Sequence, residues 1–345
     1  MSTSDLTKAT RELFIRSLVD EVYMATPVVE ELQRRRQVSY KGGTYIERLT
    51  DNGTTEDLVQ EYVVGMPLVD QKSTSLQKPR FTWKMATMPL RYDVDEYLQN
   101  ATAGDEEQLL DLVSHLTEKG HDGVRRYLCK KIFNSGSTTG VADGATGFQS
   151  LVSALDHDVT YGTRTRSFSG GTNDSWQGAD PAGLNESVTS SSQGTATNLT
   201  VANLRKWISE SSIAHNMKTA NDLYICMCPT LYNKLRAQME ARTVGYPAPV
   251  NGTASQKLTK MVLDGHTITS VPYLQTTSTM KTWVFILNMR YWEMRIHTAR
   301  NFNMTPFKWQ AENSNGYDMW LSRIMWAGNL VCWKPNSSMW LSNVS

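Results

Sequence analysis

Residues 105–133, DEEQLLDLVSHLTEKGHDGVRRYLCKKIF, predict a single amphipathic helix of unusual length. Acidic residues fill its first turn, and Lys130 and Lys131 lie in its last, which complements the helix dipole. At ~1.5 Å per residue the helix is roughly 40 Å long, so strands from elsewhere in the chain must return to pack on it. Gly120 and Gly123 fall inside it and predict a bend. The apolar stripe to be covered consists of Leu109, Leu112, Val113, Leu116, Val124, Tyr127, Leu128 and Ile132.

The segment before this helix, residues 44–92, predicts a long β-hairpin without a core of its own. TYIERL and RFTWKMATM alternate apolar and polar residues as strands do, and the residues between them are rich in turn formers, charges and prolines. A two-stranded hairpin is marginal by itself, so apolar residues on it indicate that another chain supplies the missing surface. These residues are Leu58, Val59, Val63, Val64, Met66, Leu68 and Val69.

The first forty residues predict one or two amphipathic helices. Leu6, Phe14, Leu18 and Val22 recur at helical spacing, and a second segment, PVVEELQRRR, begins at Pro27. Such helices are marginal alone in water, so we expect this arm to dock on another surface. The basic run at its end can contact nucleic-acid phosphates, although a solvated helix end is the favoured interpretation; it consists of Arg34, Arg35 and Arg36.

The second half of the chain predicts an α+β domain followed by further strands. Residues 134–200 are rich in Gly, Ser, Thr, Asp and Asn, and we interpret them as surface loops whose large side chains, Tyr161, Phe168 and Trp176, pack on a domain. The pattern that follows predicts helices at 200–215 and 229–242, strands at 222–228, 260–271 and 281–289, and late strands within 291–307 and 318–344.

Composition excludes several classes of function. Thirty-five Lys and Arg against 34 Asp and Glu leave a formal charge of +1, so no global field draws the protein to nucleic acid or to an anionic membrane. The sequence shows neither a signal peptide nor a membrane span, which predicts a cytoplasmic protein.

Catalytic and metal-binding patterns are weak throughout. Cys226 and Cys228 predict two buried, inert thiols on one side of a strand, not a Cys-x-x-Cys site. Asp156, His157 and Asp158 are interpreted as a solvated turn, since adjacent strand residues point to opposite faces. We therefore expect no enzyme, no cofactor and no metal, and the competing hypothesis is a cytoplasmic hydrolase or lyase that uses Cys332 or the Asp-His-Asp cluster.

Several motifs resemble those of one protein family. They are YIERLTDNGTTEDL (45–58), YGTRTRSF (161–168) followed by Trp176, RNFNMTPFKWQ (300–310) and RIMWAGNLVCWKPNSSM (323–339). Together with the order of arm, hairpin, long helix, α+β domain and late strands, they resemble the major capsid protein of tailed bacteriophages, which has the Hong Kong 97 fold.

The resemblance implies a division of the chain into five parts. An N-terminal arm takes residues 1–43, an extended β-hairpin loop 44–92, a peripheral domain with a long spine helix 93–145, an axial domain 146–285, and return strands that complete the peripheral domain 286–345. Seven of the ten tryptophans lie beyond residue 282. We expect most of them, including Trp326, Trp333 and Trp340, to pack the peripheral domain on the spine helix, and some to reach seams between subunits.

The implied function is self-assembly into the icosahedral shell around the genome of a tailed double-stranded DNA phage. The implied partners are copies of itself as hexamers and pentamers, a separate scaffolding protein, a portal protein, packaged double-stranded DNA bound without sequence specificity and, as a further candidate, a decoration protein. Assembly takes place in the host bacterial cytoplasm, and no membrane is involved. The alternative within the virion is a tail or decoration protein. The predicted contacts of the loop with a neighbouring subunit are Glu56, Asp57, Leu58, Glu61, Val63, Val64, Leu68, Asp70, Lys72 and Arg80.

Overall fold

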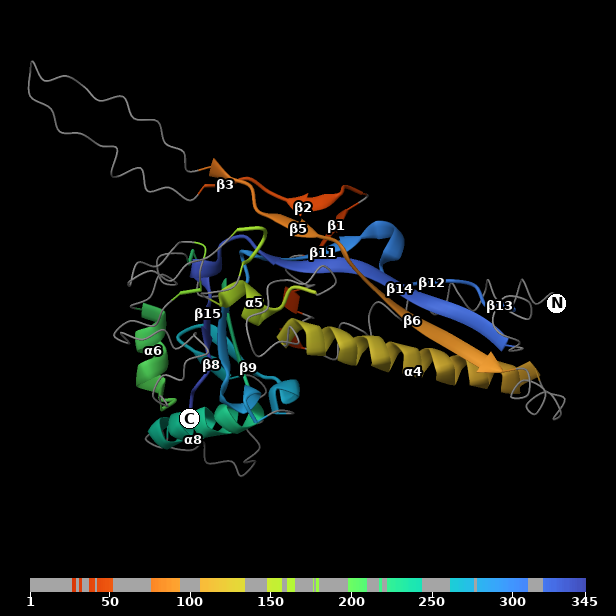
Figure 1. The fold of residues 1–345 in the computed structure, drawn as a ribbon. Coiled ribbons are helices and arrows are strands. Elements are labelled where there is room, and N and C mark those ends of the chain that lie inside the picture. Colours follow the sequence, from red (N-terminus) through yellow and green to blue (C-terminus); the bar gives the residue numbers. More distant parts are fainter. Residues whose placement is uncertain are drawn as a thin grey trace, which may run out of the picture.

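The protein was analysed as a computed structural model, which describes a defined part of the 345 residues. The described residues are 27–28, 31–32, 37–40, 42–51, 76–93, 106–133, 148–156, 160–164, 176, 178–179, 198–209, 217–218, 222–243, 261–275, 278–309 and 319–345. Within them, a six-stranded β-sheet runs along the long helix α4 (Glu106–Phe133), a five-stranded β-sheet stands at one end of that helix, and a hairpin lies above (Figure 1).

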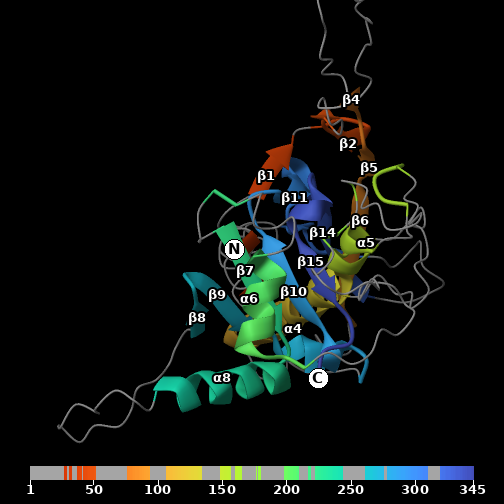
Figure 2. The same cartoon turned by 90° about the vertical axis from the view of Figure 1, so that its left-hand side faces the viewer.

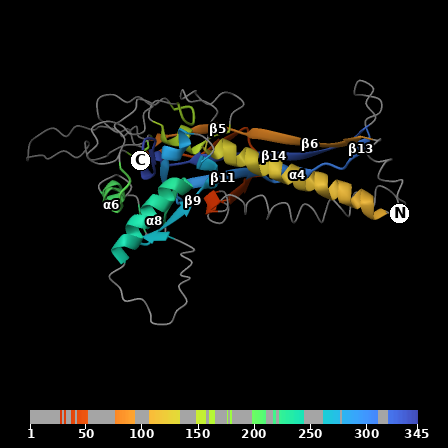
Figure 3. The same ribbon diagram turned by 90° about the horizontal axis from the view of Figure 1, so that it is seen from below.

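The six-stranded sheet is built around β14 (Met319–Cys332), a 14-residue strand. On one side it pairs antiparallel with β6 (Lys84–Asp93), from Met319↔Asp93 to Gly328↔Lys84. On its other side it pairs in turn with three strands, which are β13 (Lys308–Trp309), β12 (Asn303–Met304) and β11 (Trp292–His297). Seen from below, α4 runs along this sheet (Figure 3).

Alternation along β6 explains how the helix and the sheet fit together. Lys84, Leu90 and Tyr92 are buried, while the odd-numbered residues of the strand are exposed. A Cβ atom on Gly120 would lie 2.7 Å from Cδ2 of Leu90, and one on Gly123 would lie 2.8 Å from Cε of Met88. The two glycines therefore allow close approach of helix to strand, and α4 continues through both as one element.

The predicted long helix is confirmed to within a residue at its start, and its C-terminal half carries much of the predicted stripe. Val124, Leu128 and Ile132 are buried. Tyr127 is a correction, because its side chain is 37% exposed and Lys131 lies over its ring. At the edge of the stripe a ring with a hydroxyl group can remain in solvent, and the pattern alone does not distinguish this position.

The five-stranded sheet has the order β15-β10-β7-β9-β8. Its central strands β7 (Leu223–Met227) and β10 (Val284–Asn288) are antiparallel, and all their residues are buried. β9 (His266–Ser270) runs parallel to β7, and the edges are β8 (Met261–Leu263) and β15 (Met339–Leu341). The helices α6 (Val201–Ser209) and α8 (Pro229–Thr243) lie beside this sheet (Figure 2).

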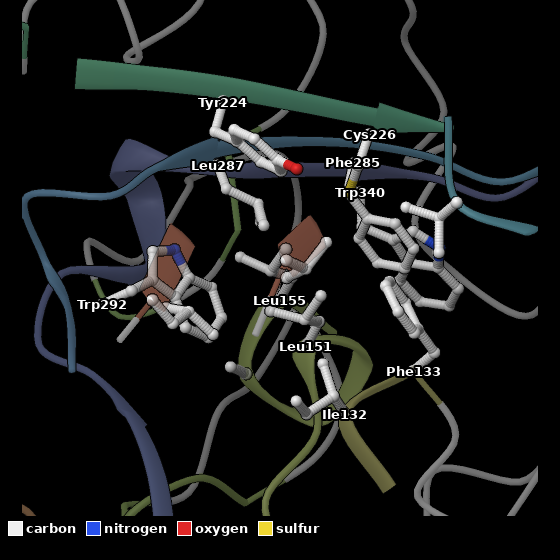
Figure 4. Close-up of a cluster of buried hydrophobic side chains, with 14 of the residues drawn as sticks. Ile132, Phe133, Leu151, Leu155, Tyr224, Cys226, Phe285, Leu287, Trp292 and Trp340 are labelled. Atoms are coloured by element: carbon white, nitrogen blue, oxygen red, sulfur yellow. The ribbon is translucent and has the colours of Figure 1, made fainter. Parts of the chain in front are cut away.

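The C-terminal end of α4 enters the core of the five-stranded sheet. Ile132 and Phe133 lie with Leu151 and Leu155 of α5 (Leu151–Leu155) beneath the strands (Figure 4). The Phe133 and Phe285 ring centroids are 5.8 Å apart. One continuous hydrophobic core therefore joins the long helix to both sheets.

The strands near the termini differ from the sequence-based expectation. β1 (Gln37–Tyr40), which was not predicted, pairs parallel with β11, from Gln37↔Met294 to Tyr40↔His297. β15 joins β10 in the five-stranded sheet. The sequence-based expectation was that residues 286–345 complete the peripheral domain, which contains the long helix. Both pairings join segments far apart in the sequence, which hydrophobic periodicity cannot reveal.

The arm and the tryptophans are partly described. Val28 and Leu32 are helical and buried, as the second predicted arm helix requires, while residues 1–26 lie outside the described part. Trp326, Trp333 and Trp340 are all buried within the chain, and Trp340 packs against Trp283 in the five-stranded sheet, with centroids 5.2 Å apart. Trp309 is the exposed ring among the described tryptophans, at 59%.

Candidate assembly surfaces

The hairpin is paired over two short ladders. β2 (Tyr45–Glu47) pairs antiparallel with β5 (Arg80–Thr82), and β3 (Thr50–Asp51) pairs with β4 (Leu76–Gln77) farther out. Ile46 and Phe81 face the body and are buried. Tyr45, Leu49 and Leu76 remain 48%, 59% and 63% exposed. The hairpin therefore presents apolar side chains that its own chain does not cover.

Most of the predicted contact residues lie outside the described residues. This holds for Glu56, Asp57, Leu58, Glu61, Val63, Val64, Leu68, Asp70 and Lys72, and also for Arg34, Arg35 and Arg36. Their roles stay predictions.

Arg80 is the predicted contact residue that the structure describes, and it belongs to a charge cluster on the hairpin. Its Nε lies 3.3 Å from Oε2 of Glu47, and Nζ of Lys78 donates to Oε1 of the same carboxylate at 2.5 Å. The hydrogen bond from Lys78 is the main reason that the pKa of Glu47 is lowered. These exposed pairs cross the β2–β5 ladder and support its register.

The root of the hairpin is held by β5. The Phe81 ring packs edge-on against Tyr161 and Trp333, with centroids 4.9 Å and 5.8 Å away. The backbone N–H of Arg80 donates to the Gly162 carbonyl at 3.0 Å. Asn329 of β14 donates from Nδ2 to the Thr82 carbonyl at 3.0 Å. The strand is thus fixed on both sides by hydrogen bonds and by aromatic packing.

Gly162 makes this contact possible. Its φ is +62°, a conformation that L side chains rarely adopt, and a Cβ atom there would lie 2.6 Å from Cζ of Phe81. Tyr161 beside it is fully buried, its carbonyl accepts from Nε1 of Trp176 at 2.9 Å, and its hydroxyl accepts from the Cys332 N–H at 2.7 Å. The burial of Tyr161 and Trp176 confirms the prediction for two of the three large side chains in the loop region, and Phe168 lies outside the described residues.

A buried carboxylate lies under the hairpin. Glu293 of β11 is 3% exposed, and its Oε2 accepts from Nε of Arg295 at 2.9 Å and from Nε1 of Trp333 at 2.7 Å. Its Oε1 lies 3.6 Å from Nη1 of Arg48, which stands between β2 and β3. Both guanidinium groups also lie over the Trp333 ring, at 5.8 Å for Arg48 and 5.6 Å for Arg295.

This cluster was missed in the sequence. A signal was present, because Glu293 and Arg295 stand two apart in the otherwise apolar strand WEMRIH, and residues two apart share a face. Charges on an apolar strand indicate a paired buried group.

A second candidate surface is the face of the six-stranded sheet that points away from α4, called here the outer sheet face. Paired residues share a face, so the exposed residues of β6 mark it. The strands β6, β13 and β14 contribute the exposed charges Arg91, Lys308 and Arg323 against Asp93. Met85 contributes an exposed apolar side chain, and Nη1 of the exposed Arg300 lies 3.3 Å from its Sδ. The described part of this face is therefore mainly basic.

Of the residues considered as catalytic or metal-binding candidates, the cysteines lie in the hydrophobic core. Cys226 and Cys228 are fully buried, as predicted, and burial raises the pKa of the Cys226 thiol. Cys228 donates from Sγ to the Lys281 carbonyl at 3.0 Å. His157 and Asp158 lie outside the described residues. Among the residues that are described, no three His, Cys, Asp or Glu side chains converge on a common point.

Membrane insertion through a helix finds no support in the described segments, where none is both long and apolar enough to span a bilayer.

Known structures share this architecture over nearly the whole chain. A chain of the cyanophage A-1(L) capsid asymmetric unit matches 92% of this chain and 93% of its own length, with a TM-score of 0.66 at 13% identity. A chain of the mature bacteriophage PhiM1 capsid matches 90% and 85%, with a TM-score of 0.51 at 12% identity. For the cyanophage Pam1 capsid the values are 89% and 88%, with a TM-score of 0.51 at 10% identity.

Sequence comparison alone does not detect these similarities. Neither a protein-family model nor a curated relative matches the chain. At such low identity the structural matches establish the fold and not a role for any residue. The chain therefore has the mixed α+β capsid fold of the Hong Kong 97 type, which its sequence predicted.

Proposed function

We propose that this chain is the major capsid protein of a tailed double-stranded DNA bacteriophage, and that its copies assemble into the icosahedral shell around the genome. The observation that carries the proposal is the match to a phage capsid chain over more than nine-tenths of both chains. The exposed apolar residues of the hairpin support it, because a shell is a setting in which neighbouring copies cover them.

The parts of the fold receive roles under this proposal. Residues 1–43 are the arm and 44–92 the extended loop. Helix α4 is the spine helix, and with the six-stranded sheet it forms the peripheral domain. The five-stranded sheet with α6 and α8 forms the axial domain, and β15 belongs to it because it pairs with β10.

In the shell, the loop of each subunit lies over a neighbour's outer sheet face. Four acidic residues and one lysine between positions 52 and 75 leave the end of the loop with negative charge. The receiving face carries Arg91, Lys308 and Arg323. Opposite charges set the register of the contact, and the apolar side chains of both surfaces provide buried area.

Each contact in such a shell can be weak. Hexamers and pentamers link many copies, so that later contacts form as effectively intramolecular steps. The near-zero net charge limits repulsion between copies and keeps the inner wall from binding DNA too tightly during packaging. A scaffolding protein, a portal protein, a decoration protein and non-specific contacts with packaged DNA belong to the proposal as candidate partners.

Electron microscopy of the purified recombinant chain, alone and with a candidate scaffold, tests this function. Closed shells or flat hexameric sheets are expected. Rings, tubes or small trimers would favour a tail or decoration protein instead. A uniform monomer or dimer, even with scaffold, would contradict the capsid role.

Changing Val63 and Val64 to Asp tests the predicted loop contact. Two buried negative charges in an apolar interface without partners are strongly unfavourable, so shells should be lost. The matched control changes Thr54 and Thr55, polar residues of the same loop, to Asp, and it should assemble more efficiently than the valine variant. Normal particles from the valine variant would show that the loop is not the assembly contact.

A further inference from the structure

We propose that Glu293 is a positioning residue that sets the direction in which the hairpin leaves the body, through its ion pair with Arg48. The geometry of the pair stands on the structure alone. Only its consequence for shells rests on the proposed function.

The carboxylate lies where it can act on the hairpin and on the body together. Glu293 belongs to β11, in the interior of the six-stranded sheet, and its side chain is 4% exposed. Oε2 is occupied by Arg295 and Trp333, which anchor it to the body. Oε1 faces Arg48, whose side chain is 57% exposed and comes from the hairpin. One buried charge therefore connects the sheet to the base of the loop.

The Arg48 contact adds a restraint that the β5 contacts do not provide. Phe81, the Arg80 N–H and the Thr82 carbonyl all hold β5. A strand held along one line can still rotate about that line. The other strand, β2, is held by the buried Ile46 and, just before it, by the Gly43 carbonyl, which accepts from Nε1 of Trp83 at 2.8 Å. Arg48 follows β2, so its attraction to Glu293 adds a charged contact farther out along this strand that opposes the rotation.

Trp333 adds a stacking surface to the charged contact between Arg48 and Glu293. Its ring lies against Phe81 on β5, its indole N–H holds Glu293, and the guanidinium of Arg48 lies over it. A planar guanidinium can stack and pair at once, which a flexible ammonium group does less well. The direction of the hairpin is thus coupled to the side-chain arrangement at the end of β14.

The contact is reversible by its nature. Arg48 is more than half exposed, so solvent and salt weaken its attraction to Glu293. Arg295 is buried and remains bound to Glu293 when Arg48 leaves. The pair therefore restrains the hairpin without locking it, which suits a loop that must meet a neighbour during assembly.

The direct test is a distance distribution between spin labels on the full chain before assembly. One label replaces Leu76 on the hairpin and the other replaces Val262 on β8, both exposed positions, in a Cys129→Ser background because the other three cysteines are buried. Arg48→Met should at least double the width of the distribution. Glu293→Gln should widen it further, because it also weakens the bond that holds Arg295.

The matched control is Lys78→Met. Lys78 is a hairpin cation of similar exposure, but its carboxylate partner, Glu47, lies on the hairpin itself. The control should keep the original width. A width in Arg48→Met equal to that of Lys78→Met would overturn the proposal, and Arg48→Met decides it even if Glu293→Gln does not fold. Because the readout uses unassembled protein, failure here is distinct from failure to form shells.

Discussion

In the five-stranded sheet every residue of β7 and β10 is buried, whereas in the hairpin Tyr45, Leu49 and Leu76 are about half exposed or more. Both regions are made of paired β-strands. The sheet completes its core within the chain, with α4 and α5 beneath it. The hairpin completes only the face formed by Ile46 and Phe81. The difference indicates that one region provides stability and the other is available for association.

The largest expected loss of stability comes from the centre of the five-stranded sheet. Phe285→Ala removes a fully buried ring that contacts Phe133, Trp283 and Trp340. The cavity and the lost burial should lower the free energy of unfolding by about 3–5 kcal/mol. Chemical denaturation of the unassembled chain measures this. Leu76→Ala on the hairpin is the contrast and should change it by less than about 0.5 kcal/mol. Equal losses would contradict the division into two regions.

A smaller effect is expected where the hairpin meets the body. Gly162→Ala must place a side chain in a left-handed conformation, with its Cβ 2.6 Å from the Phe81 ring. We expect a loss of about 1–3 kcal/mol in the free energy of unfolding. Gly42→Ala is the control, because nothing lies within 4 Å of its added Cβ. Thermal unfolding should show a lower melting temperature for Gly162→Ala than for Gly42→Ala. Identical melting curves would mean that the turn accepts the added side chain without loss of stability.

The smallest effect concerns a surface pair beside the five-stranded sheet. Arg205 donates to both carboxylate oxygens of Asp264, at 2.7 Å and 2.8 Å, and these hydrogen bonds lower the pKa of Asp264 below its usual 3.8. The folded state therefore gains stability above pH 3.8 and loses it as the pH falls through the lowered pKa. Both side chains are about half exposed, so Asp264→Asn should cost no more than about 1 kcal/mol at neutral pH.

Denaturation curves at neutral and acidic pH check this contribution. The difference between the original chain and Asp264→Asn should shrink as the pH falls below 3.8. A difference that stays constant with pH would show that the pair is not its source.

The sequence pattern predicted helices and strands correctly where the hydrophobic periodicity is regular and the residues that begin and end a helix are clear. The long helix, the helix that begins at Pro229 and the strand around Cys226 lie where the sequence places them. The predicted helix at 200–215 is described as α6 up to Ser209. These are properties of short stretches, and a single sequence contains them.

The hydrophobic pattern of a single sequence does not indicate which distant segments pair as strands. Nothing in QVSY indicates that it will lie parallel to residues 294–297, and nothing in MWL near the end indicates β10 as its partner. The glycines in α4 are a similar case, because their reason is the position of Leu90 and Met88 on another strand. The same holds for Glu293, whose partners come from the hairpin and from the end of β14.

We propose that the hairpin serves association while the body supplies stability, and one variant measured in two ways separates the two roles. Leu49→Ser combined with Leu76→Ser removes exposed apolar side chains at the described outer end of the hairpin. We expect an unfolding free energy within about 0.5 kcal/mol of the original chain, together with a large loss of closed shells in electron micrographs. Normal shells from this variant, or a body that unfolds as readily as Phe285→Ala, would contradict it.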